Sequence, residues 1–388
     1  MANPLLELKN HGQSVWYDNL NRELLKTGEL QRMVDEDGVT GGTSNPSIFE
    51  KAVGGSDAYD EHLQEIVRGD VSLDETYDAL TVTDVALSAD VFRPAYDRTE
   101  GGDGYASLEV SPLIAHETEP TISDAKRLFA ALDRPNAMIK IPGTAEGLPA
   151  VEHCLAEGLN INITLLFGVE NYEQVALAYL KALEKRMEAG QPIDRIGSVA
   201  SFFVSRVDTL VDSRLEERIQ AAESELERER LGALKGKAGV ANAKIAYARY
   251  QELFSGSRWE ALAAKGARVQ RCLWASTSTK NPDYRDVLYA EELIGPDTVN
   301  TMPQSTLDAF REHGIVAATL TQGVDEAQAH IRELENVGID FRAVTDELQV
   351  QGVKLFADSY EKARATVEEK RDRILAEKKR IGAASRGD

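Results

Sequence analysis

Short apolar segments alternate along the chain with longer stretches in which apolar residues recur every three or four positions. The longer stretches predict amphipathic helices, and Ser72 with Glu75 has the spacing of a capping box at the start of one of them. The short segments predict eight strands, at residues 14–18, 38–42, 106–110, 137–141, 160–163, 196–201, 269–274 and 298–302. This alternation favours a parallel (β/α)8 barrel of the TIM type, and a doubly wound open sheet is the alternative α/β layout. A ninth possible strand at residues 315–320 weakens the count.

Two long segments interrupt the alternation and predict helical insertions. Residues 52–104 follow the second strand, and residues 208–266 follow the sixth. Within the second insertion, residues 216–230 consist almost entirely of Glu, Arg, Ala and Leu. This composition predicts a solvated helix, and a helix that binds a partner is the less favoured alternative.

The end of the chain predicts a long amphipathic helix followed by a tail. Residues 368–388 are rich in charge and are expected to fray. A chain of 388 residues suits a single (β/α)8 domain, so we expect residues 1–388 to form one barrel. The apolar residues that recur with a helical period are Val353, Phe356, Tyr360, Ala363 and Val367.

The composition is acidic, with a formal net charge of −21. A surface of this sign repels nucleic acids and anionic membranes, so neither is expected as a partner. A phosphorylated substrate would therefore need lysine and arginine side chains gathered at its site. Only two cysteines, no signal-peptide pattern in residues 1–20 and no run of about 20 apolar residues together predict a cytoplasmic protein.

Lys140 is the first candidate for chemistry. Alternate side chains of a barrel strand point inward, and Ile139 and Ile141 suit the face that packs on helices. Lys140 and Met138 then face the interior, where a lysine is costly unless it is paired or neutral. A neutral amine is a nucleophile toward ketones. The alternative is a lysine at a strand end whose ammonium reaches solvent.

Polar side chains at other strand ends add acid–base and hydroxyl-binding groups. Asp18 and Glu109 stand where catalytic residues gather in barrels and could shuttle protons, whereas each could instead cap a helix or pair with an arginine. Asn45, Asn162 and Thr164 need partners that sugar hydroxyls would supply, although Asn45 also precedes a proline in a turn signal.

Arg206 and Lys280 follow the sixth and seventh strands, where barrels of this kind often bind phosphate. Arginine offers a bidentate fork, and serine hydroxyls such as those of Ser201 and Ser276 add donors. The alternative for Lys280 is an ordinary surface charge. The six histidines have no metal-binding spacing, and neither a phosphate-binding loop nor a dinucleotide fingerprint occurs, so no metal and no cofactor are expected.

In order, these segments resemble the transaldolases, from about residue 15 to residue 367. Each segment is moderately specific, and the ordered set is strongly so. The segments are Asp18, Thr-Ser-Asn-Pro at 43–46, Leu-Glu-Val at 108–110, Ile-Lys-Ile-Pro at 139–142, Asn-Ile-Thr-Leu-Leu-Phe at 162–167 and Ser-Phe-Phe-Val-Ser-Arg at 201–206.

The resemblance implies a (β/α)8 barrel and a role for each matching residue. Transaldolases are expected to have an arginine after the seventh strand, whereas this chain has Lys280, which lacks the bidentate fork. The long insertion suggests the larger bacterial subgroup. The implied roles are Schiff-base lysine for Lys140, general acid–base for Asp18, a water held by Glu109 and Thr164, hydroxyl binding by Asn45 and Asn162, and phosphate binding by Ser201 and Arg206.

The implied function is transfer of a dihydroxyacetone unit from sedoheptulose 7-phosphate to glyceraldehyde 3-phosphate, which yields erythrose 4-phosphate and fructose 6-phosphate in the pentose phosphate pathway. The alternatives are a Schiff-base aldolase that releases free dihydroxyacetone and a non-catalytic barrel that binds sugar phosphates. Phe203 favours transfer, because the resemblance points to a tyrosine there in fructose 6-phosphate aldolases. A monomer or homodimer is expected.

Overall fold

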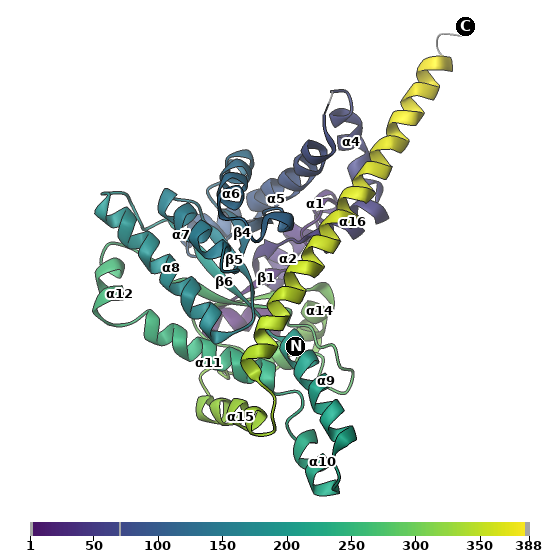
Figure 1. Cartoon of the computed structure of the whole chain (residues 1–388). Coiled ribbons are helices and arrows are strands. Elements are labelled where there is room, and N and C mark those ends of the chain that lie inside the picture. Colours follow the sequence, from purple (N-terminus) through teal and green to yellow (C-terminus); the bar gives the residue numbers. More distant parts are fainter. Residues whose placement is uncertain (1–2, 70, 385–388) are drawn as a thin grey trace.

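Eight parallel strands close into a barrel at the centre of the molecule (Figure 1). The computed structural model describes residues 3–69 and 71–384, and of residues 377–384 the backbone alone. Each strand pairs with the next along the chain, and β8 pairs with β1, so the sheet closes on itself and the predicted (β/α)8 barrel is confirmed. The strands are β1 (Gln13–Tyr17), β2 (Val39–Thr43), β3 (Ala106–Glu109), β4 (Ala137–Pro142), β5 (Ile161–Leu166), β6 (Ser198–Phe203), β7 (Arg271–Ala275) and β8 (Thr298–Met302).

The alternation of side chains along the strands produces two separate apolar layers. Ile139 and Ile141 of β4 pack outward with residues of the surrounding helices. Met138 of the same strand packs inside the barrel with Val199 and Leu273. Lys140 lies two residues after Met138 on β4, so its side chain also points into the barrel, as the sequence pattern predicted.

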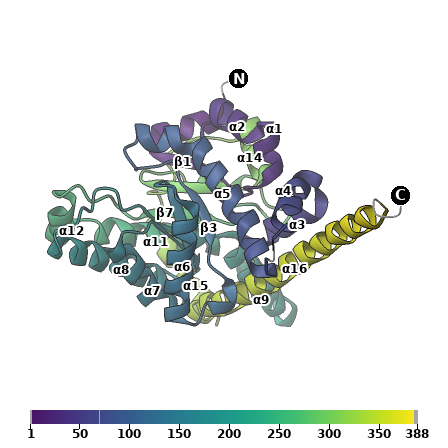
Figure 2. The same cartoon turned by 90° about the horizontal axis from the view of Figure 1, so that it is seen from above.

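Helices cover the outside of the barrel (Figures 1 and 2). Both predicted insertions are helical: α3 (Pro46–Gly55), η2 (Asp57–Tyr59), α4 (Asp60–Ile66) and α5 (Leu73–Arg98) follow β2, and α9 (Ser205–Ala221), α10 (Glu225–Gly232), α11 (Ala238–Leu253) and α12 (Gly256–Ala263) follow β6. The capping box of Ser72 and Glu75 is confirmed. The other helices are η1 (Pro4–His11), α1 (Arg22–Thr27), α2 (Glu29–Asp37), η3 (Pro112–Ile114), α6 (Thr118–Leu132), α7 (Gly147–Glu157), α8 (Val169–Glu188), α13 (Leu288–Glu292), α14 (Gln304–His313), α15 (Val324–Asn336) and α16 (Phe341–Ala384).

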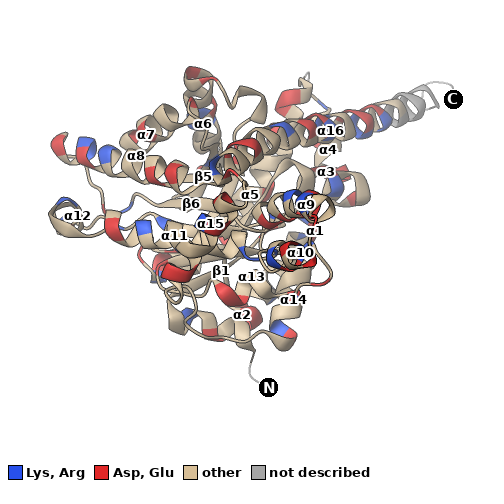
Figure 3. Ribbon diagram, turned by 60° about the horizontal axis from the view of Figure 1, so that its bottom comes forward, with Lys and Arg blue, Asp and Glu red and all other residues tan. Residues whose placement is uncertain are grey.

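Two expectations about local structure need correction. Residues 315–320 form a loop between α14 and α15 rather than a ninth strand, and Leu320 is fully buried while its N–H donates to the carbonyl of Ile294 (3.1 Å). Packing accounts for Leu320 alone, because Ile315 at the start of the segment is 64% exposed. Residues 216–230 are helical and largely exposed, but they belong to two helices, because Ser224 caps α10 with its hydroxyl and ends the continuation of α9 (Figure 3).

The expected fraying from residue 368 is wrong as far as Ala384, since α16 continues to that residue and crosses the molecule as its longest helix (Figure 1). The cause is packing against the first insertion. Ile374 is buried there, and Lys370 donates to the carbonyl of Val53 (3.2 Å) and pairs with Asp60 (2.7 Å). Residues 385–388 of the predicted tail lie outside the described residues.

In the part of the chain that the structure describes, no helix has the length and apolarity required to cross a membrane.

Candidate active site

Most of the predicted site residues line one cavity of about 440 Å³ at the carboxyl ends of the strands. Glu109 and Asn162 do not belong to this lining: Glu109 lines another cavity, of about 480 Å³, which shares Asn45 with the first, and Asn162 is fully buried. The predicted residues in the lining are Asp18, Asn45, Lys140, Thr164, Ser201, Phe203, Arg206, Ser276 and Lys280. Side chains from six different strands or the loops after them therefore converge, as barrel geometry favours.

Lys140 is buried in this cavity, with 5% of its surface exposed. Its Nζ donates to the carbonyl of Ser44 (3.1 Å) and lies 3.4 Å from Oε2 of Glu109. The ring centroid of Phe356, from α16, lies 5.9 Å from the same nitrogen. The alternative of a strand-end lysine that reaches solvent is therefore wrong.

Glu109 and Thr164 present buried oxygens to the neighbourhood of Lys140. The register pairs Glu109 of β3 directly with Lys140, and Pro142, two residues further along β4, with Thr164 of β5. Neither carboxylate oxygen of Glu109 nor Oγ1 of Thr164 has a hydrogen-bond partner among the described residues. Burial raises the pKa of Glu109, and the nearby ammonium of Lys140 opposes this shift. Buried oxygens of this kind suit a site that holds a water molecule.

Asp18 extends from the end of β1 toward the cavity. Its Oδ1 accepts a hydrogen bond from Thr43 (2.7 Å), and its N–H donates to the carbonyl of Met302 (2.9 Å). Burial raises the pKa of Asp18, against the opposing effects of Lys140 and Thr43. The expected alternative of a helix cap does not apply, because Asn21 caps α1 instead.

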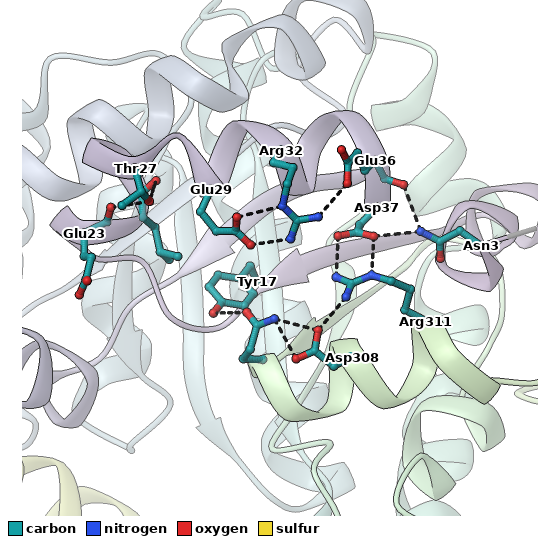
Figure 4. A network of polar contacts seen from close by, with 12 residues as sticks. Asn3, Tyr17, Glu23, Thr27, Glu29, Arg32, Glu36, Asp37, Asp308 and Arg311 are labelled. Atoms are coloured by element: carbon teal, nitrogen blue, oxygen red, sulfur yellow. Dashed lines mark hydrogen bonds and ion pairs between the residues drawn. The ribbon is translucent and has the colours of Figure 1, made fainter.

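A polar network on the outside of the barrel holds the end of β1 from which Asp18 extends (Figure 4). The hydroxyl of Tyr17 donates to Gln304 at the start of α14 (2.8 Å), and Gln304 in turn donates to Asp308 (2.9 Å). Arg311 then joins Asp308 to Asp37 at the end of α2, with 2.7 Å contacts to both. The network thus links β1, α2 and α14.

The two predicted hydroxyl-binding asparagines have different positions. Asn45 lines the cavity, but its Oδ1 caps α3 by accepting from the N–H of Ile48 (3.1 Å). Asn162 is fully buried beneath the cavity, where Nδ2 donates to Ser107 (3.1 Å) and Oδ1 accepts from Ser201 (2.6 Å). Of these three hydrogen-bonded side chains, only that of Ser201 lines the cavity, so direct hydroxyl binding by Asn162 stays a prediction.

The cationic side of the cavity is formed by Arg206, in the first turn of α9, and Lys280, in the loop after β7. Arg206 lies over the ring of Phe203, 5.6 Å from its centroid, and Nζ of Lys280 donates to Ser278 (2.5 Å). Burial lowers the pKa of Arg206; partial loss of hydration and the charge of Arg206 lower that of Lys280. A cation whose charged form is disfavoured by a neighbouring cation suits a site for an anion.

Several lining residues were missed by the sequence reasoning: Thr43, Lys51, Ser278 and Phe356. Lys51 lies on α3, one helical turn after Ser47, and both line the cavity. Phe356 was recognised only as part of an apolar helical stripe. No local signal distinguishes a stripe residue that packs on the core from one that covers a site. Among the described residues, no cluster of histidine, cysteine and acidic side chains has the arrangement of a metal site.

Comparison with known proteins identifies the family. The model of the family described as Transaldolase/Fructose-6-phosphate aldolase matches residues 15–367. Curated relatives include Transaldolase 2 of a Nostoc species (46% identity over 95% of this chain and 97% of the relative), the transaldolase of Acidothermus cellulolyticus (47% over 98% and 100%) and that of Mycolicibacterium paratuberculosis (48% over 92% and 94%). The resemblance drawn from the motifs is confirmed. The chain therefore belongs to the transaldolase family, and it is an enzyme of the transaldolase type that acts on sugar phosphates.

Proposed function

We propose that Lys140 forms the Schiff base through which this enzyme transfers a dihydroxyacetone unit from sedoheptulose 7-phosphate or fructose 6-phosphate to an aldose phosphate. The observation that carries the proposal is the position of Lys140, buried in the cavity with the carboxylate of Glu109 at 3.4 Å. An amine must be deprotonated before it attacks a carbonyl. Glu109 is suited to accept that proton, since burial raises its pKa.

The proposed reaction needs few groups. Nζ of Lys140 adds to the C2 carbonyl, and a water held by Glu109 and Thr164 carries protons while the carbinolamine loses water to give an iminium ion. Asp18 takes the C4 hydroxyl proton, and the electrons of the C3–C4 bond move into the iminium as the aldose leaves. An acceptor aldehyde then meets the enamine, the new C–C bond forms, and Asp18 returns the proton. Hydrolysis of the iminium frees Lys140.

In this proposal Arg206 and Lys280 bind the substrate phosphate with help from Ser276 and Ser278. Local positive charge is required because the chain as a whole is strongly acidic. Monomer or homodimer and a cytoplasmic location remain predictions.

Arg206→Ala should weaken binding of phosphorylated substrates and leave non-phosphorylated sugars nearly unaffected. Loss of one charged hydrogen-bonding partner is worth about 1.5–3 kcal/mol, so KM for glyceraldehyde 3-phosphate, with sedoheptulose 7-phosphate as donor, should rise by roughly 10- to 150-fold. Steady-state kinetics with glyceraldehyde 3-phosphate and glyceraldehyde as acceptors measure the difference. Arg258→Ala, on the exposed α12 and paired with Glu184, is the matched control. An equal loss for both acceptors would remove Arg206 from the phosphate site.

Phe203 is proposed to favour transfer over simple cleavage. Its ring lines the same cavity as Thr164, with its centroid 5.2 Å from that of Phe167. Because phenylalanine has no hydroxyl, it cannot donate a hydrogen bond to a water near Thr164. Hydrolysis of the three-carbon intermediate should therefore be slow until an acceptor arrives.

We expect the wild-type enzyme to release almost no dihydroxyacetone from fructose 6-phosphate alone and to form product when erythrose 4-phosphate is added. Phe203→Tyr should speed the release and reduce transfer, as an assay of dihydroxyacetone with and without acceptor would measure. Phe203→Leu, which adds no hydroxyl, is the control. Rapid release by the wild-type enzyme would favour the aldolase alternative, and no turnover under either condition would favour the binding-protein alternative.

A further inference from the structure

Two aspartates on α9 make the same pair of contacts one helical turn apart. Asp208 accepts from the N–H of Gly239 (2.8 Å) and from the hydroxyl of Tyr289 (2.8 Å). Asp212 accepts from the N–H of Gly236 (2.9 Å) and from the hydroxyl of Tyr284 (2.6 Å). We call these four contacts the aspartate clamp; its two rungs are formed by Asp208 and by Asp212.

The clamp joins three segments that are distant in sequence. The aspartates belong to α9, the glycines flank the turn into α11, and the tyrosines lie between β7 and β8. Arg206 lies on α9 two residues before Asp208, and Lys280 lies four residues before Tyr284. Each rung therefore connects the helix that carries one cation of the proposed phosphate site to the segment that carries the other.

The backbone next to the cavity does not by itself determine the distance between the two cations. Near the strand ends, the N–H of Ser205 donates to the carbonyl of Ser276 (3.1 Å), and the two hydroxyls lie 2.9 Å apart. Thr277 ties the start of the loop to β8 by donating to Oδ1 of Asn300 (2.9 Å), and Lys280 lies three residues beyond it, on the stretch that leads to α13. Beyond the contacts of Ser276, Tyr284 gives this loop a second connection to α9, through Asp212.

The geometry around the two glycines leaves no room for side chains. A Cβ at Gly239 would lie 2.7 Å from the carbonyl oxygen of Val204. At Gly236, where φ is +70°, it would lie 2.6 Å from the ring of Tyr284. Close approach of the turn to the aspartates thus depends on glycine at both positions.

The rung of Asp208 and Tyr289 is buried, whereas Asp212 and Tyr284 are partly exposed. Asp208 is almost completely buried, and burial raises its pKa to about 6. Hydrogen bonds from the N–H of Gly239 and the hydroxyl of Tyr289 offset part of the free-energy cost of burying the carboxylate. A second cavity of about 210 Å³ is lined by Asp208, Asp212, Tyr284 and Tyr289. Lys280 lines both this cavity and the proposed active site, so it stands at the junction of the two.

We propose that the aspartate clamp is a positioning device that holds Lys280 at a fixed place opposite Arg206 for binding of the substrate phosphate. Tyr284 and Tyr289 are its positioning residues, and the helical insertion after β6 supplies the frame. This inference rests on the proposed phosphate site and adds to it a reason for the insertion. A lysine has a flexible stem and no planar fork, so its value as a phosphate ligand depends more on how its loop is held.

The test compares Tyr284→Phe, Tyr289→Phe and the double variant, each of which removes only hydroxyls. KM for glyceraldehyde 3-phosphate should rise about two- to tenfold in each single variant, as expected for loss of one hydrogen bond, with kcat nearly unchanged. The double variant should show a larger rise than either single one. KM for non-phosphorylated glyceraldehyde should stay constant, and the inhibition constant for inorganic phosphate should rise with that for the phosphorylated acceptor.

Tyr247→Phe is the matched control. Tyr247 lies on α11 of the same insertion, but its hydroxyl donates to the carbonyl of Pro296 (2.9 Å), just before β8 and hence at the opposite end of the barrel. Tyr247→Phe should change the melting temperature but not the ratio of KM for phosphorylated acceptor to KM for non-phosphorylated acceptor. The clamp proposal is overturned if the tyrosine variants remain folded and KM rises equally for both acceptors, or if kcat alone falls. It is also overturned if they behave like the wild type while Arg206→Ala loses phosphate selectivity. If the wild type and Arg206→Ala show no phosphate selectivity, the phosphate site itself is wrong.

Discussion

Borohydride reduction in the presence of fructose 6-phosphate should inactivate the enzyme by adding a reduced three-carbon unit to the peptide that contains Lys140. Reduction converts the iminium to a secondary amine that cannot hydrolyse, so the adduct survives digestion and mass spectrometry locates it. Lys140→Arg should abolish both the adduct and the activity, because a guanidinium stays protonated and cannot form the Schiff base.

The matched control for this prediction is Lys244→Arg. Lys244 is buried to a similar degree, with 8% of its surface exposed, but its Nζ pairs with Glu292 at 3.2 Å away from the cavity lining. That variant should still be labelled at Lys140. A label on Lys51 or Lys280, which also line the cavity, would contradict the assignment.

Asp18→Asn should lower kcat by roughly 10²–10⁴ with little change in KM, because the amide keeps an oxygen for the bond from Thr43 but cannot take the C4 hydroxyl proton. Schiff-base formation does not need Asp18 in the proposed mechanism. Borohydride should therefore trap the whole six-carbon sugar phosphate on Lys140 of this variant. A large rise in KM with kcat unchanged would make Asp18 a binding residue instead.

The pH profile offers a second measurement on Asp18. Burial raises its pKa, and protonation at low pH removes the base. The wild-type kcat/KM should therefore fall, as pH decreases, at a higher pH than an ordinary aspartate would give, and Asp18→Asn should lack this limb. Asp103→Asn is the control: Asp103 is also buried but accepts bonds from Trp16 (2.8 Å) and Thr40 (2.8 Å) near the start of the strands, away from the lining of the cavity.

Most of the fold was predictable because its signals are local. The strand boundaries differ from the predicted ones by a few residues at most, and both insertions are helical. The errors arose where a distant contact or a single cap decided the outcome. Ile374 and Lys370 extend α16 past the expected fraying point by packing on the first insertion, and Ser224 divides an otherwise uniform helical sequence.

The candidate site was predictable to the extent that strand ends share one edge of a barrel. That rule collected Lys140, Asp18 and Arg206 in one cavity. It did not predict that Asn162 would bond to Ser201 beneath the cavity, since the layer of an inward side chain depends on the register between strands.

The period of apolar residues specifies which face of each element is buried, so the sequence favoured a barrel with Lys140 facing inward over an open sheet or a lysine that reaches solvent. Which side chains meet in the barrel depends on its three-dimensional arrangement. Glu109 reaches Lys140 through the register of β3 with β4, and Phe356 covers the lysine because α16 crosses the ends of the strands. Such contacts join residues far apart in the chain and depend on register and helix crossing, which no local pattern encodes.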